Sequence, residues 1–446
     1  MSRRLVAFGA VELALLSTFA WIPSAHRFPT PGLVMFGAAF LVYALAALTV
    51  GRGDEATGES HGSRPMVVLW TLAILMRVAL LPLAPELSDD FHRYLWDGHV
   101  QLSGINPYVH APGAQELEGI RTAYHSGINN PTVPTIYPPL AQIAFLLIGL
   151  AGSSVFAMKA LWIMCDLATG WVLGRIARAT GRDPLRVLVL YLWAPVLIVE
   201  VAWSGHLEPL GLLPLAGAIW AGVSLRRDRR SAAATGGLLA MSALVKFAPA
   251  AALPALARRG PGLLPERSGT QLAGVAAFAL TALILYAPYA AAGPALFTGL
   301  QTYGEHWWFM KGAFGLVEAL AGDPFLARRI VGFGVVAVIA LTWFARFDLE
   351  RTLLWVLGAG MILTPTFHPW YVLWMLPMAA LRSSPSWIAL SGLAFIGYFG
   401  LGSYQETGEW LQPALARAAL WIPFFTLLAG EALYRRSTGE VVSQRG

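Results

Sequence analysis

The chain contains few cysteines and few charged residues. Its single cysteine, Cys165, excludes an internal disulfide framework and a cysteine-based metal cluster. Only 13% of the 446 residues are charged, whereas a typical soluble domain carries about 25%. The net charge of +6 comes mainly from arginines that gather in short loops, as in the cytoplasmic loops of membrane proteins. These shortages exclude an ordinary soluble domain, and we expect no nucleic-acid partner.

Apolar residues are abundant instead. They make up 57% of the chain, which also has 17 tryptophans and 45 glycines, as multi-span membrane proteins do. Twelve runs approach the ~20 residues that a helix needs to cross the hydrocarbon core: 5–22, 32–50, 66–84, 155–176, 184–203, 207–225, 271–292, 329–346, 350–363, 369–381, 386–402 and 414–434. Two further segments, 139–152 and 232–257, are short or interrupted. The sequence therefore predicts an all-α polytopic transmembrane helical bundle of about 12–14 spans.

Arginine positions predict the side of the membrane on which each loop lies, because cytoplasmic loops are enriched in Lys and Arg. We expect the first run to remain as an uncleaved span, since Glu12 interrupts it and no clear cleavage site follows. One assignment places both termini and all arginine-rich loops inside, provided that 139–152 does not cross and 232–257 crosses twice. The unusual polar segments then lie together outside: 86–138, 204–206, 293–327, 364–368 and 403–412.

The long external loop begins with an adjacent pair of acids, Asp89 and Asp90. If a helix begins near Ser88, Asp89 and Arg93 are i,i+4 neighbours, and so are Asp90 and Tyr94. We then expect Asp89 to pair with Arg93, which leaves Asp90 without a local partner. Because ionisable groups near a membrane are usually functional, we predict Asp90 to be a catalytic base and Asp89 to orient it. The alternative is a purely structural role for both acids.

The same loop resembles the first external loop of C-type (GT-C) glycosyltransferases, and most closely that of bacterial polyprenol-phosphate-mannose-dependent mannosyltransferases. The residues that carry the resemblance are Ser88-Asp89-Asp90-Phe91-His92-Arg93-Tyr94-Leu95-Trp96-Asp97-Gly98 and Gly104-Ile105-Asn106-Pro107-Tyr108. Shorter motifs fit it too: Pro134-Thr135-Ile136-Tyr137-Pro138-Pro139-Leu140, Glu200, Gly205-His206-Leu207-Glu208, Lys246-Phe247-Ala248-Pro249 and His368-Pro369-Trp370-Tyr371. The resemblance implies N-terminal spans over 1–65, a transmembrane catalytic domain over 66–434 and a cytoplasmic tail over 435–446.

The resemblance also implies a chemistry. An acid of the first external loop acts as base in this family, and Asp90 matches it through its spacing to Tyr94. The donor would be a hexose, mannose first among them, on a polyprenyl phosphate, and a hydroxyl acceptor would attack with inversion. The acceptor is left open between a glycolipid, a polysaccharide and a protein. The departing phosphate needs cations rather than a proton, so we expect no cofactor, with a divalent metal left open.

Three residues are candidates for binding the donor phosphate. Lys246 lies inside an apolar stretch, where a lysine costs about 2.5–3.5 kcal/mol; the alternative is that it snorkels to an interface. Arg77 lies in a similar setting, and its alternative is an ion pair with a buried acid. His368 follows two prolines that break a span, and it could bind phosphate, position the acceptor or belong to an interfacial aromatic belt.

The remaining candidate substrate-binding residues are Tyr94, Tyr137, Glu200, His206 and Trp370. The Gly-His motif departs from the family pattern, because Leu207-Glu208 follows the histidine where the family often has an Asp. The spacing of its acidic and histidine side chains would permit metal ligation, but three such residues do not establish it, and we assign no metal ligand.

A transporter of a small polar or lipid-linked substrate is the main alternative function. It too would have buried charges and broken helices, but its site would lie near the midplane between repeats. A non-enzymatic scaffold is a third possibility, and it would not need carboxylates and cations on one side. Because the polar motifs gather at one predicted face, we favour a multi-pass cell-membrane enzyme whose active site faces away from the cytoplasm.

Overall fold

The computed structural model describes residues 2–18, 22, 30–57, 63–224, 228–257 and 270–438. Within these ranges the chain is helical and forms no β-strand, apart from one isolated bridge between Phe309 and Thr366. The predicted all-α polytopic bundle is confirmed. Three predictions fall partly outside the described residues. They concern the cytoplasmic tail, the arginine-rich loop that contains Arg226 and Arg227, and the end of the first apolar run.

The first half of the chain forms the long N-terminal helices and the loop region that follows them. Its elements are α1 (Ser2–Thr18), α2 (Thr30–Thr57), α3 (Ser63–Leu80), α4 (Asp90–Leu102), η3 (Gln115–Ile120), η4 (His125–Gly127), α5 (Pro139–Leu150), α6 (Val155–Ala179), α7 (Pro184–Leu192), α8 (Pro195–Ile198), the π-helical η5 (Val199–Trp203) and α9 (Glu208–Ser224). Pro195 cannot donate a backbone N–H, so the chain bends by 52° between α7 and the segment Pro195–Trp203.

The second half adds further membrane helices and several short ones. They are α10 (Arg229–Ala243), η6 (Ala248–Ala257), α11 (Thr270–Tyr286), η7 (Ala287–Phe297), α12 (Thr298–His306), α13 (Ala313–Ala321), α14 (Pro324–Phe344), α15 (Leu349–Leu363), η8 (Pro369–Trp374), α16 (Leu376–Arg382), α17 (Pro385–Leu393), η9 (Ala394–Gly400), α18 (Leu401–Thr407) and α19 (Ala414–Ser437). The predicted interruption of 232–257 is confirmed, because α10 ends at Ala243 and η6 begins at Ala248.

Seven helices in the described chain are long and apolar enough to cross a membrane, or eight if the bent α7–η5 pair counts as one span. The predicted number of about 12–14 spans is therefore too high by this measure. Several apolar runs form helices that are shorter than a span, among them α5, α9 and η6. The run 369–381, for example, divides into the six-residue 3-10 helix η8 and the seven-residue α16.

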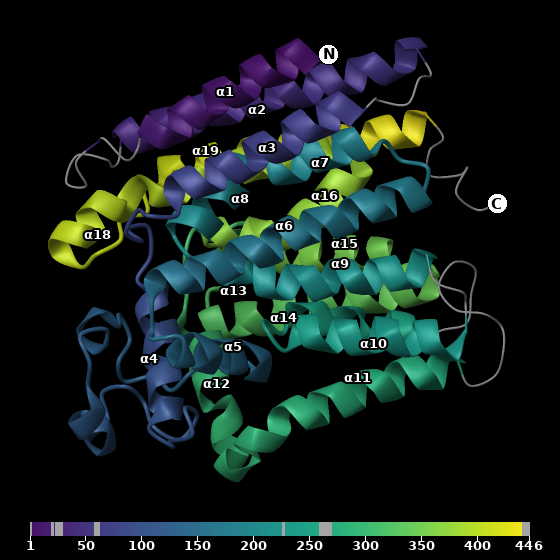
Figure 1. Cartoon of the computed structure of the whole chain (residues 1–446). Helices are drawn as coiled ribbons and strands as arrows, with labels where there is room; N and C mark the ends of the chain where they lie inside the picture. Colours follow the sequence, from purple (N-terminus) through teal and green to yellow (C-terminus); the bar gives the residue numbers. More distant parts are fainter. Residues whose placement is uncertain are drawn as a thin grey trace.

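The helices run roughly side by side and give the bundle two distinct ends (Figure 1). We call the end with α4, α12 and α18 the cavity end; it lies at the left. α1 begins and α19 finishes toward the opposite side, which we call the terminal end. All the polar segments that the arginine pattern predicts to share one side lie toward the cavity end, so that part of the predicted topology agrees with the fold.

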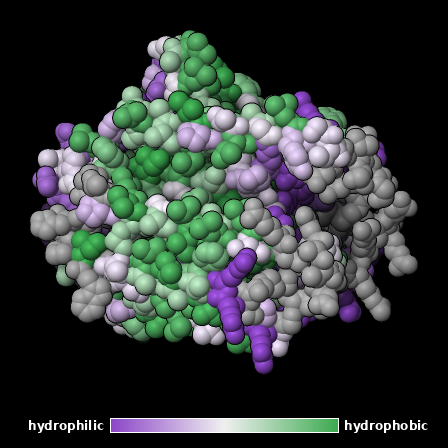
Figure 2. All heavy atoms as spheres, turned by 90° about the horizontal axis from the view of Figure 1, so that it is seen from above, coloured by the Kyte–Doolittle hydropathy of each residue, from purple (hydrophilic) through white to green (hydrophobic). Residues whose placement is uncertain are grey.

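The lateral surface is apolar. Figure 2 shows hydrophobic residues across the middle of the face seen from above, with hydrophilic residues toward its edges. On α2 the large side chains of Val34, Leu41 and Leu48 are each more than half exposed. An apolar surface of this extent is unfavourable in water but matches the hydrocarbon interior of a bilayer. The structure is thus that of a multi-pass membrane protein.

Candidate active site

A cavity of about 750 Å³ occupies the cavity end of the bundle. Its wall comes from five parts of the chain that are distant in sequence: 86–93 and 128–138 of the long loop, 246–248 in the break after α10, 300–309, the α15–η8 region, and 401–412. Of the predicted site residues, six lie on this wall: Asp89, Asp90, Tyr137, Lys246, His368 and Trp370. The tertiary structure therefore brings together residues that the sequence separates by nearly 300 positions.

The acid pair stands where α4 begins. Asp89 is the N-cap residue without a side-chain cap bond, and the Asp90 N–H donates to Ser88 Oγ at 3.2 Å. The expected Asp89–Arg93 pair is wrong. Arg93 Nε instead donates to Asp97 Oδ1 at 2.8 Å, and Asp89 Oδ2 accepts from the Tyr404 hydroxyl at 2.7 Å. Asp97 sits one turn further along the same helix and is buried, so it competes better for the guanidinium than the N-cap acid does.

The Asp90 carboxylate lines the cavity and has no hydrogen-bond or ion-pair partner among the described residues. Burial raises its pKa above the ordinary aspartate range. The charge of Lys246 acts in the opposite direction, as does His206 when it is protonated, while the negative charges of Glu208 and Asp89 add to the increase. A partner-free carboxylate with a raised pKa is a stronger proton acceptor than an ordinary aspartate.

Lys246 projects from the break between α10 and η6. The break is held in place by α5, whose Leu140 N–H donates to the Leu244 carbonyl at 2.9 Å. The Lys246 ammonium forms an ion pair with the buried Glu208 and lies 4.9 Å from the centre of the Tyr371 ring. Its side chain still lines the cavity. Lys246 is thus an anchored cation that faces the same space as Asp90.

Aromatic rings form a continuous row beside this cation. Trp370 stacks on the buried His206 at 3.9 Å and on His368 at 4.5 Å, and His368 stacks in turn on Phe309 at 4.5 Å. Burial, with the nearby charge of Lys246, lowers the pKa of His368 to about 3. Burial also lowers the pKa of His206 to about 4. Both imidazoles are therefore neutral at pH 7 and can act only as hydrogen-bond groups.

Four predicted binding residues do not reach the cavity wall. Arg77 is fully buried and forms an ion pair with Asp166, 2.5 Å away. This confirms the alternative to donor binding, which was an ion pair with a buried acid. Tyr94 packs between the rings of Tyr137 and Phe145. Neither side chain lines the cavity, so we assign neither to substrate.

Glu200 and His206 form a second layer behind the wall. Glu200 accepts from the Tyr398 hydroxyl at 2.7 Å, and His206 Nδ1 lies 2.9 Å from its other oxygen. His206 supports the inner face of the Trp370 ring. This pair supports wall residues from behind. No group of three or more His, Cys, Asp or Glu side chains in the described chain is arranged to hold a metal ion, so we assign no metal ligands.

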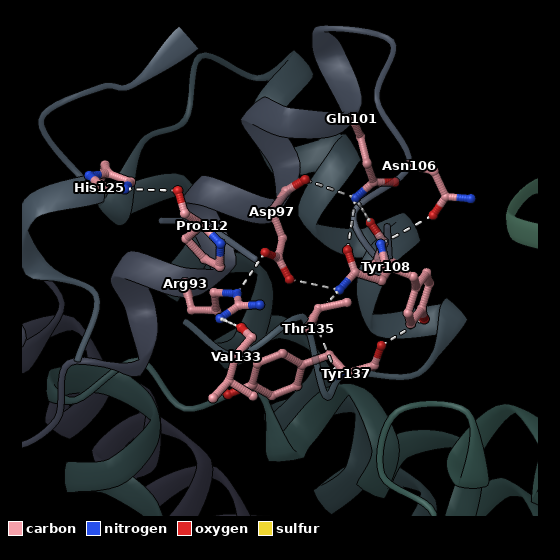
Figure 3. Close-up of polar contacts among 11 residues, drawn as sticks. Arg93, Asp97, Gln101, Asn106, Tyr108, Pro112, His125, Val133, Thr135 and Tyr137 are labelled. Carbon is pink, nitrogen blue, oxygen red and sulfur yellow. Dashed lines mark hydrogen bonds and ion pairs between the residues drawn. The ribbon is translucent and has the colours of Figure 1, made fainter. Parts of the chain in front are cut away.

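A polar network fixes a further part of the cavity wall (Figure 3). Gln142 Nε2 donates to Asp97 Oδ2 and to Thr135 Oγ1, both at 2.8 Å. Arg93 Nη1 donates to the Val133 carbonyl at 3.0 Å. These bonds join α4 and α5 to the segment 133–137, whose Ile136 and Tyr137 line the cavity.

The cavity also has a deep, apolar side. Its wall on α15 is formed by Val356, Leu357, Gly360 and Met361, below Thr364 at the rim. At 1.5 Å per residue, Val356 lies about 12 Å further into the bundle than Thr364. The cavity is thus amphiphilic, with acids and a cation near the bundle end and an apolar wall that extends between membrane helices.

The sequence patterns did not reveal every wall residue. Arg93 was expected only as an ion-pair partner, and the residues of 401–412 were not singled out, although that segment was predicted to lie outside. They belong to no local motif. The only signal is compositional, because a tryptophan and two glutamines follow a tyrosine in a chain that is poor in polar residues.

The chain is similar in sequence to known mannosyltransferases. A family model described as alpha-(1->6)-mannopyranosyltransferase, N-terminal domain, matches residues 6–259. The alpha-(1->6)-mannopyranosyltransferase A of Mycobacterium tuberculosis is 24% identical over 442 residues, which cover 90% of this chain and 83% of that protein. The protein of the same name from Corynebacterium glutamicum is 29% identical over 184 residues, covering 40% of this chain and 36% of that one.

Proposed function

This chain belongs to the alpha-(1->6)-mannopyranosyltransferase family, and from that premise we propose that it transfers mannose from a polyprenyl-phosphate donor to a glycan hydroxyl. Membership of this family identifies it as a membrane mannosyltransferase of the GT-C type. The donor, the linkage and the residues that do the chemistry are our proposal. We further propose that the chain lies in the cell membrane with its cavity end outside.

The observation that carries the proposal is the amphiphilic cavity. A sugar linked to a lipid by a phosphate has a polar head and a long apolar tail. The cavity offers Asp90 and Lys246 to the head, and the α15 wall at Val356 and Met361 to the tail. A water-soluble nucleotide sugar would gain nothing from an apolar wall about 12 Å deep along α15. A lipid-linked donor therefore fits this cavity better.

In the proposed reaction Asp90 accepts the proton of the acceptor hydroxyl as its oxygen attacks the anomeric carbon of the donor sugar. The new C–O bond forms on one face while the bond to the phosphate oxygen breaks on the other. The polyprenyl phosphate leaves as an anion, so no acid is needed. Inversion that gives an α linkage, the linkage in the relatives' names, requires a β-linked donor.

Lys246 is the residue best placed to receive the phosphate. Its anchoring by Glu208 keeps the ammonium in one position, and preorganised charge stabilises a developing anion without reorganisation. The neutral His368 beside it would donate a hydrogen bond rather than provide charge. Asp89, held by Tyr404, would keep the neighbouring Asp90 in place. Dependence on a divalent metal is left to experiment.

The test uses the purified full-length chain in lipid discs, with radiolabelled mannosyl polyprenyl phosphate as donor and an octyl mannobioside as acceptor. We expect transfer by the natural chain, and a loss of about 10²- to 10⁴-fold in kcat for Asp90→Asn, because the base is removed while the shape is kept. Asp323→Asn is the matched control, since Asp323 caps α14 and is not on the cavity wall.

Two results would contradict the proposal. An Asp90→Asn variant with normal kcat would remove the base assignment. A natural chain that binds the donor but transfers mannose to neither the acceptor nor water would favour the transporter alternative. Thermal unfolding of each variant shows whether a lost activity reflects chemistry or folding.

A further inference from the structure

The segment 401–412 forms one side of the cavity mouth, and we call it the C-terminal hairpin. It consists of α18 and the irregular segment that follows Gly408. Gly408 ends the helix in the left-handed conformation (φ 76°). α18 projects at the left of Figure 1, at the cavity end. The hairpin lies outside residues 6–259, the part of the chain that the family model matches.

The hairpin contacts the acid pair and the residues just before it through Tyr404 and Gln405. Tyr404 donates to Asp89, and Gln405 Nε2 donates to the Glu86 carbonyl at 3.3 Å. Asp90 lines the same cavity but has no hydrogen bond to the hairpin. Two separate anchors therefore flank Asp90 on the wall: Tyr404 holds Asp89, and Glu208 holds Lys246. If the donor phosphate lies at Lys246, a hydroxyl that gives its proton to Asp90 approaches from the hairpin side.

Trp410 is the largest side chain of the hairpin on the cavity wall. Its ring centre lies 5.1 Å from that of Tyr404, and it packs edge-on against Phe309 at 5.3 Å. Its indole N–H donates to the Gly397 carbonyl at 3.1 Å. The ring is therefore held in one orientation, is only partly covered, and belongs to the aromatic row that continues through Phe309 to His368.

Side-chain amides share the cavity wall with this ring. Gln412 lines the cavity and has its oxygen engaged by the Met310 N–H at 2.7 Å, which leaves its amide N–H groups for a ligand. Asn129 and Asn130 of the long loop also line the cavity, and the Asn129 side chain lies within hydrogen-bond reach of Tyr404. A fixed aromatic face covers the apolar face of a sugar ring, and amides bond its hydroxyls, so this combination suits a neutral sugar.

We propose that the C-terminal hairpin is the acceptor subsite, in which Trp410 is the platform for the sugar that receives mannose and Gln412 bonds one of its hydroxyls. This inference rests on the proposed function, because it names where that reaction takes its acceptor. It separates the two substrates in space: the donor between Lys246 and the α15 wall, the acceptor between the hairpin and the long loop. Trp410 acts by binding and takes no part in proton transfer.

The test measures the two substrates separately in Trp410→Ala. We expect KM for the octyl mannobioside to rise about tenfold, with KM for the mannosyl polyprenyl phosphate and the slow hydrolysis of the donor by water unchanged. Trp410→Phe keeps a ring against Phe309 and Tyr404 and should restore most of the acceptor affinity. Trp171→Ala is the matched control, since Trp171 is 57% exposed on α6 and is absent from the cavity wall.

Calorimetric titration of the octyl mannobioside without donor separates this inference from the proposed function. The subsite is supported if the natural chain binds the octyl mannobioside and Trp410→Ala does not, even if no transfer occurs. Transfer by the natural chain with an unchanged acceptor KM in Trp410→Ala overturns the subsite and leaves the proposed function standing. An equal rise in both KM values also overturns it. If Trp410→Ala does not fold, the same comparisons are made with Gln412→Ala, which removes the amide expected to bond the acceptor.

Discussion

At Asp90, burial and charge act in opposite directions on one carboxylate. Burial and the neighbouring acids raise its pKa, whereas Lys246 and a protonated His206 lower it. The base works in its ionised form, so activity is lost as pH falls through this raised pKa, above the ~3.9 of an unperturbed aspartate. The acid limb of the pH profile thus reports the surroundings of a single side chain.

Asp89→Asn tests this balance. Removing the negative charge beside Asp90 should lower the Asp90 pKa and move the acid limb of kcat/KM to lower pH. The asparagine oxygen can still accept from Tyr404, so the local structure is kept. The measurement is transfer activity against pH, with Asp348→Asn, an N-cap of α15, as control. An acid limb that stays in place or moves upward would contradict the electrostatic account.

At the scale of elements, one part of the cavity wall depends on a network rather than on a helix. Residues 133–137 have no regular structure, and their position comes from Arg93, Asp97 and Gln142 (Figure 3). Asp97 is the central member, because its two oxygens accept from both other side chains. It is buried, so its partners have no water to replace it.

Asp97→Ala should therefore destabilise the chain by about 3 kcal/mol, since it leaves a largely buried guanidinium unpaired. Transfer activity should fall as well, because the wall that carries Tyr137 loosens. Thermal unfolding in detergent and the transfer assay check the two effects. Asp323→Ala removes only a helix cap and should cost about 1 kcal/mol. A melting temperature for Asp97→Ala equal to that of this control would show that the network is dispensable.

The element-scale interruption of 232–257 could be predicted from sequence. Pro249 lacks the N–H that a continuing helix needs, and the charge of Lys246 disfavours a lipid-facing span. The number of spans could not be predicted in the same way. Apolar runs such as 139–152 and 369–381 are buried against other helices, and hydrophobicity alone does not distinguish a packed short helix from a membrane span.

For the whole molecule, the two ends of the bundle differ in their polar chemistry. At the terminal end Glu350 accepts from Arg182 at 2.8 and 3.1 Å and from Arg382 at 3.2 Å, which joins α15 and α16 to the turn between α6 and α7. At the cavity end the acids face open space. The arginines of the terminal end match the predicted cytoplasmic side, and we infer that the cavity opens on the other side.

Cysteine labelling tests this orientation, because Cys165 is the sole cysteine of the chain. In a Cys165→Ala background, Glu409→Cys on the hairpin should react with a membrane-impermeant maleimide in intact cells. Ser437→Cys, at the end of α19, should react only after permeabilisation. Both positions are exposed, and the Cys165→Ala chain is the unlabelled control. The reverse pattern would place the cavity in the cytoplasm.

Local composition and spacing determined the helical membrane class and the break at Lys246, because each depends on neighbours within a turn or two of helix. Only the tertiary structure decided which polar residues share the cavity. Arg77 turned out to pair with Asp166, and Asp89 with Tyr404, which is 315 residues away. A buried polar group needs a partner wherever the fold provides one, so its role is decided by packing rather than by its position in the chain.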